Sequence, residues 1–148
     1  MSVNLYDAEL EREPEDQRRA GYCEHYLRFG PSIGAQKLGM TIYQLDDGQR
    51  ICPYHYELGN EEWLIVLEGE PTLRTPGGEQ KLVPGDVVVF PDGPDGAHDV
   101  TGPARVVMMS TRIDPSGSVY PDSNKIGIWP PGKLFRLDDA VDYFEGEK

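Results

Sequence analysis

The sequence has little positive charge. It contains 14 lysine and arginine residues against 26 aspartate and glutamate residues, so its formal net charge is −12. Nucleic acids and anionic membranes are bound through basic surfaces that displace counterions. We therefore predict that the protein binds neither nucleic acid nor a membrane. Part of the acid is local, because residues 138–147 alone carry five carboxylates, which is typical of a solvated surface.

Cysteines and long apolar runs are also scarce. The two cysteines, Cys23 and Cys52, do not have the spacing of a metal site. No stretch approaches the roughly eighteen apolar residues of a membrane-spanning helix. The opening MSVNLYDAELEREPED lacks the apolar core that a signal peptide needs. These absences predict a cytoplasmic protein with two free thiols.

Glycine and proline, in contrast, are abundant, with 17 and 13 residues. They separate short apolar runs, which favours many strands and turns over a few long helices. The runs of strand character are GAQKLGMTIYQL, RICPYHYE, EWLIVLEG, PTLRT, QKLVP, DVVVFP, AHDV, ARVVMMST and KIGIW. This spacing over 148 residues predicts one all-β domain, a small antiparallel sandwich or barrel.

Two of the runs, DVVVFP and RVVMMS, are apolar on both faces. One face of each strand fills the barrel, so the other face must also be covered. A second sheet, the terminal arms or another subunit can provide that cover. We therefore predict a homodimer.

Residues 52–69 read CPYHYELGNEEWLIVLEG, which has the pattern of a β-hairpin. If Leu58–Glu61 form the loop, Glu57 and Glu62 lie directly opposite each other with their Cβ atoms about 5 Å apart. Side chains alternate along strands, so His55 shares their face. One imidazole and two carboxylates are thus predicted at one end of an otherwise apolar face.

Two carboxylates at that distance repel each other, and burial raises the cost of each charge. A divalent cation removes both problems. Without one, the carboxylates can share a proton, or one of them can turn into solvent. An exposed polar hairpin end is the remaining interpretation.

A second polar stretch, PGDVVVFPDGPDGAHDV, covers residues 84–100 and contains His98. This histidine follows a strand and a loop that has too much glycine to be helical. The third histidine of the chain, His25, has no partner pattern, and we interpret it as structural.

Together the two stretches resemble the two signature motifs of the cupin superfamily. The first motif is His-x-His, three or four residues, Glu, six residues, Gly. It corresponds here to His55-Tyr56-Glu57, then Glu62 after four residues, and Gly69 after six more. The resemblance extends over about residues 34–113.

The second motif is Gly, five residues, Pro-x-Gly, two residues, His, three residues, Asn. It corresponds to Gly85, then Pro91 and Gly93, with His98 after four residues instead of two. The resemblance implies a small antiparallel β-barrel, or jelly roll, that is often dimeric and holds one metal ion at its mouth. It implies a barrel core over 34–113, an N-terminal arm over 1–33 and a C-terminal extension over 114–148. Carried over by position, the metal ligands are His55, Glu57, Glu62 and His98.

The sequence departs from the cupin pattern at two positions. Glu57 stands where the second histidine is usual, and Gly102 stands where the asparagine is usual. Two nitrogen and two carboxylate ligands favour a divalent transition metal, namely Mn²⁺, Fe²⁺, Zn²⁺ or Ni²⁺, over soft Cu⁺.

Three classes of function follow from this resemblance. The first is an enzyme that acts on a small molecule in the barrel by isomerisation, epimerisation or dioxygenation. The second is a non-catalytic module that binds or senses a small ligand, and the third is a vestigial barrel without metal. We leave the catalytic residues unassigned. Candidate residues for a substrate pocket are Tyr43, Tyr54, Arg74 and Tyr120.

Overall fold

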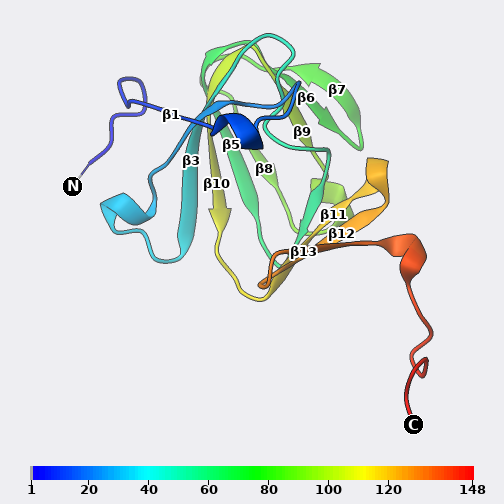
Figure 1. Ribbon diagram of the computed structural model, residues 1–148. Helices are drawn as coiled ribbons and strands as arrows, with labels where there is room; N and C mark the ends of the chain where they lie inside the picture. Colours follow the sequence, from blue (N-terminus) through cyan, green and yellow to red (C-terminus); the bar gives the residue numbers. More distant parts are fainter. Residues whose placement is uncertain (1) are drawn as a thin grey trace.

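The computed structural model describes residues 2–148 and consists of antiparallel strands joined by turns and short 3₁₀ segments (Figure 1). In this part of the chain there is no α-helix. No helix within residues 2–148 is therefore long and apolar enough to span a membrane. The predicted all-β antiparallel barrel is confirmed.

The largest sheet has the strand order β1-β2-β3-β10-β5-β8. Its strands are β1 (Glu11–Arg12), β2 (His25–Arg28), β3 (Leu38–Leu45), β10 (Ala104–Thr111), β5 (Glu62–Gly69) and β8 (Val87–Phe90). The central strands are rich in β-branched residues, which fit a pleated and half-buried surface. Strand β10 pairs with β3 on one side and β5 on the other.

Two smaller sheets complete the barrel wall in residues 2–148, with the orders β13-β12-β11-β4 and β7-β6-β9. Their strands are β4 (Tyr56–Leu58), β6 (Thr72–Thr75), β7 (Gly78–Lys81), β9 (Asp99–Thr101), β11 (Ser116–Tyr120), β12 (Lys125–Trp129) and β13 (Lys133–Arg136). The 3₁₀ segments are η1 (Glu15–Gln17), η2 (Pro31–Ile33), η3 (Pro94–Gly96), η4 (Pro121–Ser123) and η5 (Leu137–Asp139).

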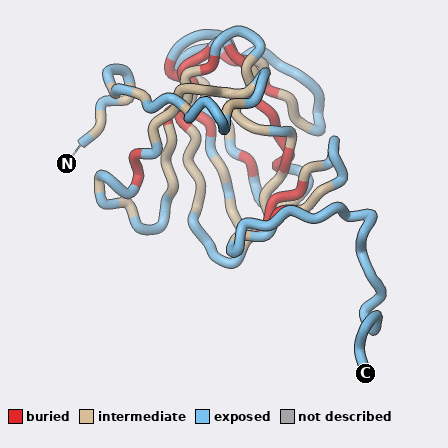
Figure 2. Tube along the Cα trace, viewed as in Figure 1, coloured by how far each residue is buried: buried red, intermediate tan, exposed pale blue. Residues whose placement is uncertain are grey.

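The main apolar core lies inside the barrel, where side chains from the three-stranded and six-stranded sheets meet. Leu64 and Val66 of β5 pack there with Leu73 of β6 and Val106 of β10, and all four are fully buried. Figure 2 shows this burial along the central strands, in contrast to the exposed C-terminal segment that leads away from the barrel. Burial of one such side chain contributes about 1.5–3 kcal/mol.

A second apolar cluster covers the outer face of β10 and β3. Leu67 and Val107 pack there with Ile42 and Phe29, and the N-terminal segment lies against them. Arg105 fixes this segment, because its guanidinium donates hydrogen bonds to the backbone carbonyls of residues 5 and 8, at 2.9 and 3.1 Å. The N-terminal segment therefore supplies one of the three covers considered for RVVMMS.

The predicted hairpin between Glu57 and Glu62 is wrong. Strand β4 pairs with β11 in the four-stranded sheet, whereas β5 pairs with β10 and β8 in the six-stranded sheet. The Gly59-Asn60 turn therefore carries the chain from one wall of the barrel to the other. The alternation of side chains was interpreted correctly, but alternation does not specify which strand is the partner.

Gly102, which replaces the asparagine of the cupin pattern, lies where a side chain does not fit. A Cβ atom at this position would be 2.5 Å from the Asp46 carbonyl oxygen and 2.6 Å from the Leu45 Cβ. The close approach of the backbone after β3 therefore requires glycine here.

Candidate metal centre

A short backbone bridge holds the two candidate histidines side by side. The His55 N–H donates to the His98 carbonyl at 3.1 Å, and the His98 N–H donates to the His55 carbonyl at 2.8 Å. The two ring centroids are 4.8 Å apart. Residues separated by 43 positions in the sequence are therefore brought together by main-chain pairing.

Each imidazole is oriented by its Nδ1 atom. Nδ1 of His55 is 3.0 Å from the Pro53 carbonyl, and Nδ1 of His98 is 2.9 Å from the Gly96 carbonyl. A carbonyl oxygen only accepts hydrogen bonds, so Nδ1 carries the hydrogen in both rings. The Nε2 atoms are left to face Glu62, which is the orientation found in metal-binding histidines.

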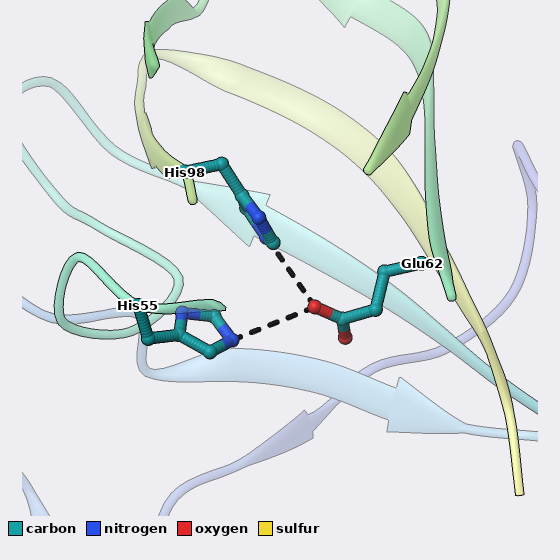
Figure 3. A group of neighbouring side chains, drawn as sticks. All are labelled: His55, Glu62 and His98. Carbon is teal, nitrogen blue, oxygen red and sulfur yellow. Dashed lines mark ion pairs between the residues drawn. The ribbon is translucent and has the colours of Figure 1, made fainter. Parts of the chain in front are cut away.

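Glu62, at the start of β5, completes a three-residue cluster. Its Oε2 atom lies 3.5 Å from Nε2 of His55 and 3.5 Å from Nε2 of His98 (Figure 3). The donor atoms of these three residues all lie within 4.8 Å of one another. Two ligands that are each about 2.1 Å from one ion lie roughly 3.0–3.4 Å apart, close to this spacing.

Two atoms of the cluster are buried without a hydrogen-bond partner among residues 2–148. They are Oε2 of Glu62 and Nε2 of His98. Buried polar atoms in native proteins are nearly always paired, since an unpaired one costs about 1–3 kcal/mol. A divalent cation between these atoms and His55 satisfies both, so the residues fit a metal ion.

Glu57 lies beside this cluster and is held by a different set of contacts. Its Oε1 atom is 3.4 Å from Nε2 of His55 and accepts a 2.7 Å hydrogen bond from Ser118. The Ser118 hydroxyl in turn accepts a 2.9 Å hydrogen bond from the indole N–H of Trp129. Glu57 is not part of the group whose donor atoms are all mutually close, so its role as a ligand stays a prediction. Ser118 and Trp129 lie outside both motifs, and no pattern in the sequence pointed to them.

The protonation of the two histidines differs. Burial opposes charge on His55, but its contacts with Cys52, Glu57 and Glu62 outweigh burial and raise its pKa. Burial lowers the pKa of His98, with the charge on Glu62 opposing it. Protonated His55 offsets the two carboxylates, and a divalent cation held by His55, Glu62 and His98 would supply the same compensation.

Aromatic rings pack against both imidazoles. The ring of Phe90, from β8, stacks on His98 at 3.7 Å between centroids, and Tyr120 stacks on His55 at 5.8 Å. These contacts restrict rotation of the imidazoles and exclude water from one side of each ring.

The cluster opens into a cavity of about 470 Å³. Of the four candidate pocket residues, Tyr43 and Tyr120 line this cavity together with Glu57 and Glu62. Burial raises the pKa of the Tyr43 hydroxyl to about 12 and also raises that of Tyr120, so both hydroxyls remain protonated donors at neutral pH.

The other two candidates, Tyr54 and Arg74, lie together in a separate surface group. The Arg74 guanidinium sits 3.9 Å from the centre of the Tyr54 ring and donates two hydrogen bonds to Asp122, at 2.6 and 3.0 Å. Arg74 is thus already paired with a carboxylate.

Comparison with known proteins identifies the fold. The model of the family described as "Cupin domain" matches residues 41–111. A sugar phosphate isomerase of the cupin superfamily from Silicibacter pomeroyi is 22% identical, with 98% of both chains covered and a TM-score of 0.79. A candidate sugar phosphate isomerase from Acidithiobacillus ferrooxidans is 23% identical, with 86% of this chain and 92% of the other covered and a TM-score of 0.73. The polyketide cyclase RemF from Streptomyces resistomycificus is 24% identical, with 78% and 82% covered and a TM-score of 0.59.

No curated protein gives a significant sequence match. At these identities the solved structures define the shared fold, which is an antiparallel β-barrel. Residues 41–111 are thus similar to a cupin domain, and the described chain shares the fold of the cupin-superfamily structure from Silicibacter pomeroyi.

Proposed function

We propose that this protein is a metal-dependent enzyme that isomerises or epimerises a small hydroxylated molecule in the barrel cavity. The observation that carries the proposal is the pair of buried atoms without a partner in the described chain, Glu62 Oε2 and His98 Nε2, next to Nε2 of His55. Two of the similar solved structures bear the name of sugar phosphate isomerases, which is consistent with this reaction class.

In this proposal His55, Glu62 and His98 hold the ion and Glu57 is the fourth ligand. The ion is Mn²⁺, Fe²⁺, Zn²⁺ or Ni²⁺, because imidazole and carboxylate suit these metals. When bound, such an ion polarises a carbonyl or hydroxyl oxygen of the substrate.

The cavity walls supply the remaining functions. The hydroxyls of Tyr43 and Tyr120 donate hydrogen bonds to substrate oxygens, because burial keeps them protonated. Ser118 holds the Glu57 carboxylate in place through its 2.7 Å hydrogen bond. Isomerisation moves a proton between neighbouring carbons, so it needs no external oxidant or reductant.

Metal analysis of protein purified without chelators is the first test. We expect about one divalent ion per chain, since a single cluster of three ligands is present in the described residues. Glu62→Gln should lose the ion, because the amide keeps the shape of the side chain but removes its charge. Glu68→Gln is the matched control, since Glu68 is an exposed carboxylate on the same strand. Equal metal content in the two variants would refute the ligand assignment.

Glu57→Ala separates the two roles open to Glu57. Loss of the ion supports Glu57 as a ligand. Retention of the ion leaves a site of three protein ligands with more open positions, and Glu57 is then a free carboxylate beside the substrate.

The reaction itself is tested by incubating the metal-loaded protein with sugars and sugar phosphates in D₂O. An isomerase or epimerase that transfers a proton through solvent incorporates deuterium at the reacting carbon, which mass spectrometry detects. Oxygen uptake with catechols, diketones or thiols would instead support dioxygenation. Silence in both assays with the metal retained favours a binding or sensor role, and absence of metal favours a vestigial barrel.

We also propose that the protein is a cytoplasmic homodimer. Both cysteines are free, as expected in a reducing compartment. Trp63, Val87 and Val89 expose apolar side chains on the outer face of the six-stranded sheet, where a second copy can cover them. Light scattering at micromolar concentration should report twice the mass of the chain, and a monomer would contradict the proposal.

A further inference from the structure

The cavity contains one guanidinium that no carboxylate of the described chain neutralises. Arg28, at the end of β2, lines the same cavity as Glu57 and Glu62. Within residues 2–148 the Arg28 side chain has no salt bridge, and its guanidinium carbon lies 5.2 Å from the centre of the Tyr26 ring. Arg28 is exposed, so its guanidinium is accessible to a ligand that enters the cavity.

The other arginines with well-defined side-chain contacts are occupied. Arg12 pairs with Glu24, Arg50 with Asp99 and Arg74 with Asp122, at nitrogen-to-oxygen distances of 2.9, 3.5 and 2.6 Å. Arg105 donates to backbone carbonyls of the N-terminal segment. These arginines serve the fold, whereas the donors of Arg28 remain available.

The strand register aims Arg28 into the barrel. Arg28 is paired with Thr41 of β3, and Tyr26 on the same strand is paired with Tyr43, which lines the cavity. Residues two apart on a strand share a face, so Arg28 and Tyr43 point to the same side of the sheet.

Arg28 and the metal cluster occupy opposite sides of the cavity. Strands β3 and β10 separate β2 from β5, so the strands that carry Arg28 and Glu62 are three strand spacings apart, or about 14 Å. Side chains reach inward from both sides. The cavity of about 470 Å³ between them is in the range that holds a small ligand.

Hydroxyl groups line the space between the two sides. Ser110 and Ser116 both line the cavity, and in the described chain neither hydroxyl is engaged in a hydrogen bond. Such groups donate to and accept from the hydroxyls of a polyol.

We propose that the cavity binds a polyhydroxylated molecule that carries an anionic group, with the anion paired to Arg28 and the reacting end at the cluster of Glu62 and the two histidines. This inference rests on the proposed function and names the substrate class of the same site. A guanidinium binds phosphate or carboxylate through two parallel hydrogen bonds, so either anion fits the chemistry. The two glutamates alone would repel an anion, and Arg28 counters that repulsion.

The test is titration calorimetry of the full-length, metal-loaded protein with three probes that share a sugar skeleton: glucose 6-phosphate, glucuronate and glucose. Arg28→Gln is compared with Arg136→Gln, an exposed arginine on β13 that is outside the cavity lining and produces the same change in net charge. Unchanged circular dichroism and melting temperature establish that both variants are folded.

We expect Arg28→Gln to weaken the affinity for the anionic probe at least 10-fold. The affinity for glucose and the metal content should not change. Arg136→Gln should change each affinity by less than 2-fold. A loss confined to glucose 6-phosphate identifies a phosphate site, and a loss confined to glucuronate identifies a carboxylate site. Equal losses in the two variants, glucose binding as tightly as the anionic probes, or no binding of either anionic probe at 10 mM would each overturn the inference.

The deuterium assay keeps this inference separate from the proposed function. Binding that depends on Arg28 without deuterium incorporation refutes the isomerase and leaves the anion site in place. Deuterium incorporation that is equal in the wild type and in Arg28→Gln supports the isomerase and refutes the anion site.

Discussion

The two ends of the barrel interior share the same strands but differ in what they bury. Along β5, Glu62 faces the cavity, while Leu64 and Val66 on the same side of the strand are completely buried in the apolar core. At the core end, the buried side chains of the cluster around Leu64 are apolar and packed against one another. At the cavity end, two buried polar atoms, Oε2 of Glu62 and Nε2 of His98, have no hydrogen-bond partner in the described residues. The core end therefore stabilises the fold, and the cavity end has the unmet polar contacts of a binding site.

The largest stability effect should come from the core end. We expect Leu64→Ala to lower the free energy of unfolding by about 2–5 kcal/mol, because it removes three buried carbon atoms and leaves a cavity between β5, β10 and β6. Urea unfolding followed by tryptophan fluorescence measures this change. Leu134→Ala is the control, since Leu134 is 48% exposed and its truncation should cost less than about 1 kcal/mol.

The same variant tests whether the core end and the cavity end act independently. If Leu64→Ala also lost the metal ion, they would not. We expect the folded fraction of this variant to keep the metal content of the wild type, since Leu64 packs in the apolar core cluster, which contains none of the three candidate ligands. Proportional loss of metal and stability would contradict the comparison.

A smaller effect on stability, with a larger effect on the site, is expected for Ser118→Ala. The variant removes the hydrogen bond to Glu57 and leaves the Trp129 indole N–H without its acceptor. We expect a loss of about 1–2 kcal/mol in unfolding free energy and a roughly 10- to 100-fold weaker metal affinity. Competition with a fluorescent chelator measures the affinity. The conservative variant Ser118→Thr retains the hydroxyl and should recover most of the affinity, and an affinity as low as that of Ser118→Ala would argue against the hydrogen bond.

The smallest effect concerns the two cysteines, which line the same surface pocket but differ in their contacts. Cys23 packs against the apolar core, and burial raises the pKa of its thiol to about 11, although its contacts with the carbonyls of His25 and Gln44 oppose the shift. Cys52 lies near the metal cluster, with its sulfur 3.5 Å from Nδ1 of His55.

Because the folded thiol of Cys23 keeps its proton to a higher pH than the unfolded thiol, its contribution to stability is complete below about pH 9 and falls as the pH rises toward about 11. By about pH 10 the loss is about 1 kcal/mol after allowance for partial solvent screening. Urea unfolding at pH 8 and pH 10 measures it. Cys23→Ala should abolish this part of the pH dependence and Cys52→Ala should not, so identical pH profiles for the wild type and Cys23→Ala would contradict the assignment.

Much of the site was accessible from the sequence because its residues follow local patterns. The period-two alternation around His55 and Glu62, together with the resemblance to the cupin motifs, predicted that these side chains share the interior with His98, and the structure brings them within 3.5 Å of one another through Glu62. The sequence did not indicate which strands pair with β4 and β5. The hairpin was wrong because β4, which carries Glu57, pairs with β11, whereas β5, which carries Glu62, pairs with β10 and β8.

The residues that the sequence did not reveal come from the segments interpreted as arms. Arg28 belongs to the predicted N-terminal arm, yet its strand is part of the six-stranded sheet. Ser118 and Trp129 belong to the predicted C-terminal extension, yet β11 and β12 form part of the barrel wall and line the cavity. None of these three residues belongs to a sequence motif. Their positions beside the cavity result from strand pairing between segments far apart in the sequence.

The sequence by itself determined that the chain folds into short antiparallel strands with an apolar interior and a polar cluster near His55, because turn residues and side-chain alternation act locally. Only the tertiary structure decided which strands pair, which carboxylate is fixed by Ser118, and that Arg28 lines the same cavity as Glu62. Those outcomes depend on contacts between residues far apart in the sequence, where distance and burial, not residue type, set the chemistry.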